Sequence, residues 1–512
     1  MPFVARRLLL RLAGFALACQ QEPNPDDTGE TTPNDSDPTD TEEPPPGGNV
    51  LLLVADDVGV DKIASYGVAS SPLAAPNIEA LAETGLRFEN AWALPYCGPT
   101  RAAMLTGRYV RRTGYGANES IAASENELGP EQTTLAEVAR TSPLFDYETA
   151  LVGKWHLSTF ESLSGATAPL TQGFDTFTGT MGNLGIWVGA AEPYDAGYFH
   201  WQKLELDGAL VEVTDYATTV VTDDAVARLA QLREPWIFEV AFHAAHGPYD
   251  RPPDSLLDDP GEPSVGVLAK ERLIVEALDK EIGRLLAAIP DDVRSRTTIL
   301  FLGDNGTAEL AVEPEVDADR SKGSVYEPGV HVPFIVQGPL VAEPGSTSSA
   351  LVHVVDIMPT VAAMVGVDLS ALPAVVDPTQ PLAIDGESLL PIFADPSVPT
   401  SRTFMYTETF YPAGPGPFTE DIQAVRDERF KLIRDARTGE EQFFEYPVGG
   451  TDEGLDLLPC PLDAEQQAAL DRLRTDLDDL LADMTFDAIW TGGDRPYERP
   501  AELLDDISCA AR

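Results

Sequence analysis

An uninterrupted apolar run, Asn49–Ala55, leads directly into the acidic pair Asp56–Asp57. A run without alternating polar positions suits a strand that is buried on both faces of a parallel sheet. A second such run, Thr298–Leu302, is followed after one glycine by Asp304–Asn305. Ligands bind beyond the carboxyl ends of the strands in open α/β sheets, so the two runs predict a polar site at one edge of a sheet.

Further apolar runs alternate with stretches of helical periodicity. The runs are Trp236–Phe242 and Val332–Val336, and the helical stretches include Ile78–Thr84 and Glu271–Ala288. This alternation predicts an α/β fold, with a large, mixed and mostly parallel sheet sandwiched by helices. No internal repeat is present, so a solenoid or propeller is not indicated.

The character of the chain changes near Pro399. Beyond it lie short strand-like pieces, Gln423–Arg426 and Phe430–Ile433, and then an acidic helical stretch from about Ala464 to Met484. We therefore expect a main domain over residues 49–399 and a smaller C-terminal α+β subdomain over residues 400–512.

The charge of the chain excludes one class of partner. With 84 acidic and 34 basic residues the net charge is −50, so nucleic-acid binding is not expected, because a phosphate backbone would be repelled. An anionic substrate would need a local cluster of Lys, Arg and His to overcome the same field.

The N-terminus has the composition of an export signal. Residues 1–19 place three arginines before a short apolar run that ends in small residues and Cys19. The run is too short to span a bilayer. Cys19 is a candidate lipoprotein processing site and membrane tether, with simple secretion as the alternative, so the protein is expected to be periplasmic, at the cell surface or secreted. Residues 20–48, acidic and rich in Pro and Thr, predict a disordered linker.

The four cysteines have different surroundings. Cys19 lies in the export segment, whereas Cys460 and Cys509 both lie near the C-terminus and could pair in an oxidising compartment. Two free thiols are the alternative. Cys97 stands apart from the other three.

The segment Cys97–Arg108, CGPTRAAMLTGR, resembles the signature of type I sulfatases, with Thr100 where Ser is commoner. Six further blocks extend the resemblance over most of residues 49–435, in the family's order: Ala55–Asp57, Ala75–Ile78, Gly153–Leu157, Ala245–Pro248, Gly303–Gly306 and Lys322–Glu327. Departures from the family pattern are Ser158, Pro328 and His331. The resemblance implies an alkaline-phosphatase-like fold and hydrolysis of a sulfate monoester.

The resemblance also implies that Cys97 is oxidised to formylglycine by a formylglycine-generating or anaerobic sulfatase-maturating enzyme. The hydrated aldehyde would offer two hydroxyls on one carbon. One attacks sulfur to give a sulfated enzyme intermediate, and loss of a proton from the other expels sulfate.

A divalent cation is the second implied component. The family implies Ca²⁺, with Mg²⁺ as the alternative, held by oxygen ligands and by the residue derived from Cys97. The oxygen ligands would be Asp56, Asp57, Asp304 and Asn305.

The resemblance assigns five further residues to the reaction. Arg101 and Lys154 would hold the hydrate and the sulfate charge, with His156 near the hydroxyl that loses its proton. His246 and Lys322 would face the leaving group. Taken singly, each of these residues could be an ordinary solvated charge or a loop residue without a role in catalysis. The chain has only 6 His, however, and all five residues fall inside blocks that match the family, which favours the functional assignment.

Several readings stay open. A phosphate or phosphonate ester hydrolase on the same scaffold, and a catalytically silent binding protein with unconverted Cys97, are the rival functions. The substrate would be a sulfated small molecule or carbohydrate. Five aromatic residues would either line the rim of a sugar- or ring-binding pocket or pack in the protein interior: Trp187, Tyr194, Tyr198, Phe199 and Trp201. We expect His243 to be a rim or supporting residue, His331 and His353 to be structural, and Asp356 to cap a helix.

Overall fold

The computed structural model describes residues 48–118, 127–184, 196–261, 264–374, 379–446, 452–484 and 486. The export segment, Cys19, Trp187, Tyr194, Cys509 and all of the expected linker except Gly48 lie outside these residues. No helix in the described ranges is both long enough and apolar enough to cross a membrane.

The main element is a ten-stranded sheet in which, among the described strands, only β9 and β5 run against the others. From edge to edge the order is β10 (Ser346–His353), β2 (Leu86–Trp92), β9 (Phe334–Gln337), β8 (Thr297–Gly303), β1 (Asn49–Ala55), β7 (Trp236–Ala241), β3 (Glu148–Lys154), β4 (Thr176–Thr180), β5 (Trp201–Leu204) and β6 (Leu210–Val213). The expected mixed, mostly parallel sheet is confirmed.

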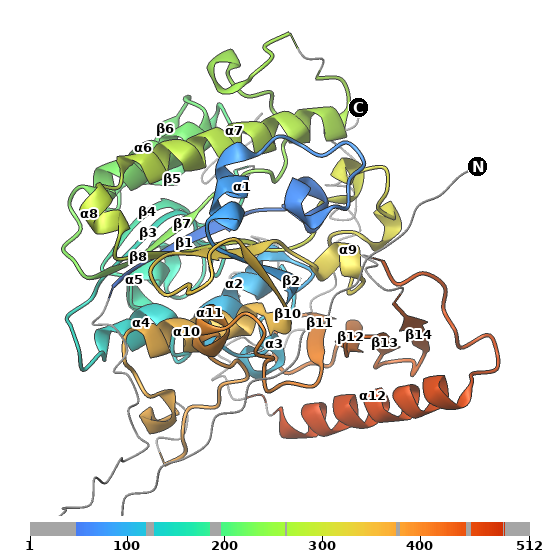
Figure 1. Cartoon of the computed structure of the whole chain (residues 1–512). Coiled ribbons are helices and arrows are strands. Elements are labelled where there is room, and N and C mark those ends of the chain that lie inside the picture. The colour runs from blue at the N-terminus through green and yellow to red at the C-terminus, as the bar shows by residue number, and fades with distance from the viewer. Residues whose placement is uncertain are drawn as a thin grey trace, which may run out of the picture. The chain divides into compact units, whose positions relative to one another are not determined.

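Strand β1 shows why this sheet needs helices on both faces. Its alternate side chains enter two separate cores, Leu52 on one side and Leu51 and Leu53 on the other, and each is at most 1% exposed. Burying each of these leucines contributes about 2 kcal/mol. The first core is closed by α2 (Cys97–Thr106), α4 (Leu135–Arg140) and α10 (Ile357–Met364), and the second by α1 (Pro76–Glu83), α6 (Ala217–Leu229) and α7 (Val267–Ala288) (Figure 1).

The remaining helices of the main sheet region are short. They are α3 (Val110–Thr113), α5 (Ala168–Thr171), α8 (Asp291–Arg294), α9 (Glu327–Val330) and α11 (Leu390–Ala394). The expected helix at Glu271–Ala288 is present as α7, which starts earlier, at Val267, directly after Gly266 with φ of 91°. That left-handed backbone ends the preceding loop and favours glycine.

The C-terminal region forms a second, antiparallel sheet covered by one helix. Its strands are β11 (Met405–Tyr411), β12 (Glu420–Arg426), β13 (Phe430–Asp435) and β14 (Glu441–Glu445), with α12 (Ala464–Asp483) packed across them (Figure 1). The expected smaller α+β element is thus confirmed. Tyr406 and Phe410 share one buried cluster with the side chains of α2, so the core continues from one sheet to the other, and the boundary at Pro399 stays a prediction.

His353 and Asp356 tie the end of β10 to the next turn. The His353 ring accepts a hydrogen bond at Nδ1 from the Val355 backbone N–H, 3.2 Å away. The Asp356 carboxylate accepts from the His353 backbone N–H at 2.8 Å and pairs with both Arg402 Nη atoms at 2.6 Å. The contacts of His353 agree with the expected structural role. Asp356 occupies the N-cap position of α10, but its side chain makes no cap hydrogen bond to that helix and instead completes the capping box of the preceding turn, Val354–Asp356.

This arrangement makes stability depend on pH. Burial, with a smaller effect from Arg402, holds the pKa of His353 well below its usual value. The unfolded chain binds a proton at about pH 6.5 and the folded chain does not, so the contribution of His353 is complete above that pH and is lost as the pH falls. Relative to His353→Asn, which keeps an acceptor in place, we expect wild type to lose about 2 kcal/mol between pH 8 and pH 5. Denaturant unfolding at both pH values measures this, and a constant difference would contradict it.

Candidate active site

Four neighbouring strands bring the expected site residues to one edge of the sheet. Asp56–Asp57 follow β1 and Asp304–Asn305 follow its neighbour β8. On the other side of β1, His246 follows β7, and Lys154 ends β3. Cys97 begins α2 at the same place. The structure thus brings into contact expected site residues that are up to 265 positions apart in the chain, Asp57 and Lys322.

The acidic residues form a compact cluster of oxygen atoms. The Asp57 carboxylate accepts hydrogen bonds from Asn305 Nδ2 at 2.8 Å and from Lys322 Nζ at 2.5 Å. Asp56 Oδ2 accepts from Lys154 Nζ. Asp56 Oδ1 and Asn305 Oδ1 are buried and have no hydrogen-bond partner among the described residues. Buried acceptors without partners are costly, and both point to a ligand that these oxygens hold.

Two overlapping sets of side chains could hold a metal ion. The ligand atoms of Asp56, Asp57 and His246 lie within 4.8 Å of one another, and so do those of Asp56, Cys97 and Asp304. Carboxylate and amide oxygens are the ligands that hard divalent cations prefer. The donor set therefore fits Ca²⁺ or Mg²⁺, with Asp56 shared by both groups.

Cys97 lies at the meeting point of the acidic and basic side chains. Its Sγ is 3.1 Å from His156 Nδ1, 3.2 Å from Asn118 Nδ2 and 3.4 Å from Lys154 Nζ, and the residue has no exposed surface. Burial raises the pKa of the thiol, although the charge of Lys154 opposes this. As an unmodified cysteine it is therefore a poorer source of thiolate than an exposed one.

Arg101 lies one turn of α2 after Cys97 and points to the acidic cluster. Its Nη2 and Nε donate to Asp304 Oδ2 at 2.8 and 3.2 Å, and Nη1 donates to the Lys154 carbonyl at 2.9 Å. The guanidinium thus connects the ends of β8 and β3. With these donors engaged, its direct contact with a sulfate group stays a prediction.

The surrounding charges shift the pKa values of the buried Asp56 and Asp304 in opposite directions. Burial alone would raise the pKa of Asp56, but Lys154 and, to a smaller extent, Arg101 hold that pKa far below its usual value. Burial and the neighbouring charge of Asp56 raise the pKa of Asp304. A bound divalent cation would favour the ionised form of both.

Both candidate catalytic histidines are neutral at neutral pH. Burial, followed by the charge of Lys154, lowers the pKa of His156, and burial, followed by the charge of Lys322, lowers that of His246. His246 Nδ1 lies 2.6 Å from the Gly247 carbonyl, which only accepts, so Nδ1 carries the hydrogen and Nε2 is unprotonated.

Lys322 is charged. Burial alone would lower its pKa, but the neighbouring Asp57 carboxylate holds the pKa well above its usual value. Its positive charge also acts on His246, whose pKa it helps to lower.

Two backbone conformations help to orient these groups. Asp57 and His156 have φ of 59° and 60°, in the left-handed region that non-glycine residues rarely adopt. Such positions cost about 1 kcal/mol or more and persist where the surrounding structure holds them.

Three further residues support the site, and two of them, Asn118 and Tyr115, have no signal in the sequence patterns. Asn118 accepts from the Gly98 N–H at 2.9 Å while its amide faces Cys97, and the Tyr115 hydroxyl donates to the His156 carbonyl at 3.2 Å. The Tyr198 hydroxyl contacts the His246 carbonyl at 2.8 Å. Neither a hydroxyl nor an amide contact of this kind can be inferred from spacing.

The expected supporting role of His243 agrees with its contacts, since its buried ring contacts Thr180 Oγ1 at 2.6 Å through Nε2. Of the five aromatic residues expected to line a substrate rim or to pack, the structure describes three. Tyr198 and Trp201 are fully buried, which favours packing, whereas Phe199 is 40% exposed.

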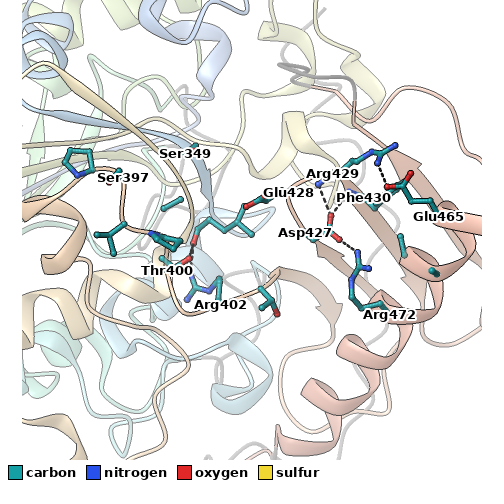
Figure 2. A pocket seen from close by; sticks show the side chains of 18 residues that line it. Ser349, Ser397, Thr400, Arg402, Asp427, Glu428, Arg429, Phe430, Glu465 and Arg472 are labelled. Carbon is teal, nitrogen blue, oxygen red and sulfur yellow. Dashed lines mark hydrogen bonds and ion pairs between the residues drawn. The ribbon is translucent and has the colours of Figure 1, made fainter.

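A cavity of about 670 Å³ lies elsewhere, between β10, the turn that precedes β13 and the N-terminal half of α12 (Figure 2). Its charged side chains pair with one another, Arg472 with Asp427 and Arg429 with Glu465. None of the expected site residues lines it. The candidate active site is therefore identified by the chemistry of the side chains around Asp56 and Cys97. The volume of this other cavity is not evidence for an active site.

Comparison with known families decides the assignment. The family model described as Sulfatase matches residues 48–367. The chain belongs to the sulfatase family. The resemblance seen in the sequence is thereby confirmed, and the protein is a sulfuric ester hydrolase. A second model, described as the C-terminal part of N-sulphoglucosamine sulphohydrolase, matches residues 320–445.

Relatives of known activity support this sulfatase assignment. Steryl-sulfatase of Mus musculus is 27% identical over 455 residues, covering 72% of this chain and 69% of the relative. Arylsulfatase A of Homo sapiens is 28% identical over 413 residues, covering 75% and 74%.

A solved structure supports the fold. The structure of Ps i-CgsB in complex with k-i-k-neocarrahexaose matches with a TM-score of 0.72 at 22% identity, covering 91% of this chain and 98% of that one.

Proposed function

We propose that this sulfatase hydrolyses a sulfate monoester with formylglycine derived from Cys97 and with a bound Ca²⁺. The observation that carries the proposal is the position of Cys97 Sγ, within 3.4 Å of His156, Asn118 and Lys154 and in a metal-competent set with Asp56 and Asp304. When present, the hydrated aldehyde supplies a nucleophilic hydroxyl and a second hydroxyl whose deprotonation releases sulfate.

His156 and Lys154 would act on a hydroxyl placed at the position of Cys97 Sγ, His156 on its proton and Lys154 on the negative charge of the sulfate. His156 Nδ1, 3.1 Å from Sγ, is neutral, so it can accept the proton of a hydroxyl placed there. Lys154 adds a positive charge, held in place by Asp56. This fixed charge stabilises negative charge on the sulfate oxygens.

The leaving group would meet Lys322, which donates to Asp57, and His246, whose ring lies near the same carboxylate. The protonated Lys322 stabilises the charge that develops on the departing oxygen and can supply its proton. Asp56, Asp57, Asp304 and Asn305 would hold the cation, which polarises the sulfate oxygens when bound.

Mass spectrometry tests the central step. In protein exported by its native host, the tryptic peptide Phe88–Arg101 is expected to carry an oxygen in place of one sulfur and two hydrogens of Cys97. Detection of the unmodified thiol alone would overturn the formylglycine mechanism. That result would favour the alternative hypothesis, a catalytically silent binding protein.

For the substrate we favour a sulfated carbohydrate, because the structural relative reported above was solved with an oligosaccharide. A panel of sulfated sugars, aryl sulfates and the matching phosphate esters, offered to matured protein, tests this choice. Faster turnover of phosphate or phosphonate esters would favour the rival hydrolase instead.

We also propose export with Cys19 as a lipid attachment site. Fractionation of cells that express wild type and Cys19→Ser tests this. Release of the variant from the membrane fraction is expected, and an unchanged distribution would contradict lipidation.

A further inference from the structure

Lys322 lies on a short loop that two different parts of the molecule hold. We call residues 320–327 the lysine loop. On its inner side, the Lys322 backbone N–H donates to the Thr307 carbonyl at 3.0 Å, and the Gly323 N–H donates to the Pro95 carbonyl at 3.0 Å. These bonds attach the loop to the main sheet region, near the acidic cluster.

On its outer side, the lysine loop meets the C-terminal region through Arg320. Arg320 Nη1 donates to Asp452 Oδ1 at 2.9 Å and to the Gly454 carbonyl at 3.2 Å. Its guanidinium carbon lies 4.9 Å from the centre of the Tyr326 ring and 5.6 Å from that of Phe444, on β14. One side chain, two residues from Lys322, thus combines two hydrogen bonds with stacking on the C-terminal sheet.

The end of the lysine loop is held by a buried polar network. Glu327 is 1% exposed, and its Oε1 accepts from Trp92 Nε1 at 2.8 Å, Tyr446 Oη at 2.6 Å and Arg426 Nη1 at 3.2 Å. The Glu327 N–H donates to Glu453 Oε1 at 2.6 Å. Three of these partners belong to the C-terminal region, so the loop is fixed to it at both ends.

A direct contact lies between these ends. The Tyr326 hydroxyl and Gln442 Oε1, on β14, are 2.5 Å apart. The family model described as the C-terminal part of N-sulphoglucosamine sulphohydrolase matches residues 320–445, and it therefore covers both the lysine loop and the second sheet.

We propose that the C-terminal sheet positions Lys322 for the leaving group, with Arg320 as the positioning residue. The proposal rests on the proposed function, in which Lys322 faces the departing oxygen. A lysine side chain has four rotatable methylene groups, so the place of its ammonium depends on how firmly its backbone is held. A shift of about 1 Å at a catalytic group can cost as much as 100-fold in rate.

The test is a series of aryl sulfates, from 4-nitrophenyl sulfate to phenyl sulfate, offered to matured Arg320→Ala. Poor leaving groups develop more charge on the departing oxygen and depend more on Lys322. We expect kcat to fall about 10-fold for phenyl sulfate and less than about 3-fold for 4-nitrophenyl sulfate.

Arg434→Ala is the matched control. Arg434 lies on β13 of the same sheet, but it pairs with Glu441 at 3.0 Å and with Asp478 of α12 at 2.6 Å. It is expected to show wild-type kcat across the series. An equal loss for all substrates in Arg320→Ala would mean a general structural role and would overturn the proposal.

A third variant, Lys322→Ala, separates this inference from the proposed function. If Lys322→Ala shows the steep dependence on leaving group and Arg320→Ala does not, the positioning role fails and the proposed function stands. If Lys322→Ala is itself uniform, the assignment of Lys322 to the leaving group fails, and the inference fails with it.

Should Arg320→Ala not fold, Tyr326→Phe serves instead, because it removes only the hydroxyl that contacts Gln442. A smaller loss, of about 3-fold and again confined to poor leaving groups, is then expected. No difference from wild type across the series would overturn the proposal.

Discussion

Replacing Cys97 by alanine is expected to lower kcat for an aryl sulfate by at least about 1,000-fold while leaving the protein folded. The reason for the loss is that alanine cannot become formylglycine. The fold should survive, because the change removes a single buried atom from a chain whose cores lie on both faces of a ten-stranded sheet. Steady-state kinetics and the thermal midpoint Tm measure the two effects.

Cys460→Ala is the matched control for this experiment. Cys460 is exposed, follows the second sheet in the chain and belongs to neither candidate metal-binding set. Its replacement is expected to leave kcat unchanged. Retained activity in Cys97→Ala would remove the basis for a nucleophile at that position.

Removal of the proposed divalent cation is expected to have the second largest effect, on activity and on stability together. Asp56, Asp57 and Asp304 converge at the edge of the sheet with Oδ1 of Asp56 unpartnered among the described residues. A ligand that binds only the folded state at 100 times its Kd stabilises it by about 2.7 kcal/mol. Chelation should therefore lower Tm and abolish turnover, and added Ca²⁺ should restore both.

The acidic surface makes a control necessary. With a net charge of −50, many carboxylates could bind Ca²⁺ weakly and raise Tm without a specific site. Asp56→Asn leaves that surface almost unchanged and removes a charge that both candidate ligand sets share. The Ca²⁺-dependent rise in Tm should disappear in this variant. The same rise in wild type and variant would place the effect on the surface. A parallel titration with Mg²⁺ distinguishes the two ions.

The apolar runs in the sequence were enough to predict the main architecture, a mostly parallel sheet covered by helices on both faces. Runs such as Asn49–Ala55 are apolar throughout because both faces of the strand are covered, and this property is visible in a single sequence. The pairs Asp56–Asp57 after β1 and Asp304–Asn305 after β8 could be expected to meet because parallel neighbours end at the same edge.

The remaining contacts depend on tertiary neighbours that no local pattern reveals. Arg101 is 203 residues from Asp304 in the chain, and the partners of Glu327 come from β2 and from the C-terminal region. The left-handed backbone at His156 also has no local signal, because glycine is the residue that normally marks such a position. A spacing argument therefore finds the reacting groups more readily than the groups that hold them.

The complete burial of Cys97 has a consequence for how the protein is made. In the folded chain its sulfur has no exposed surface and is enclosed by His156, Asn118 and Lys154. For the proposed conversion of Cys97, a maturation enzyme would have to reach the side chain to oxidise it. Conversion and folding would then compete during biosynthesis, and a chain that folds first would keep its thiol. The fraction of active protein would then depend on the supply of the modifying enzyme while the chain is still open.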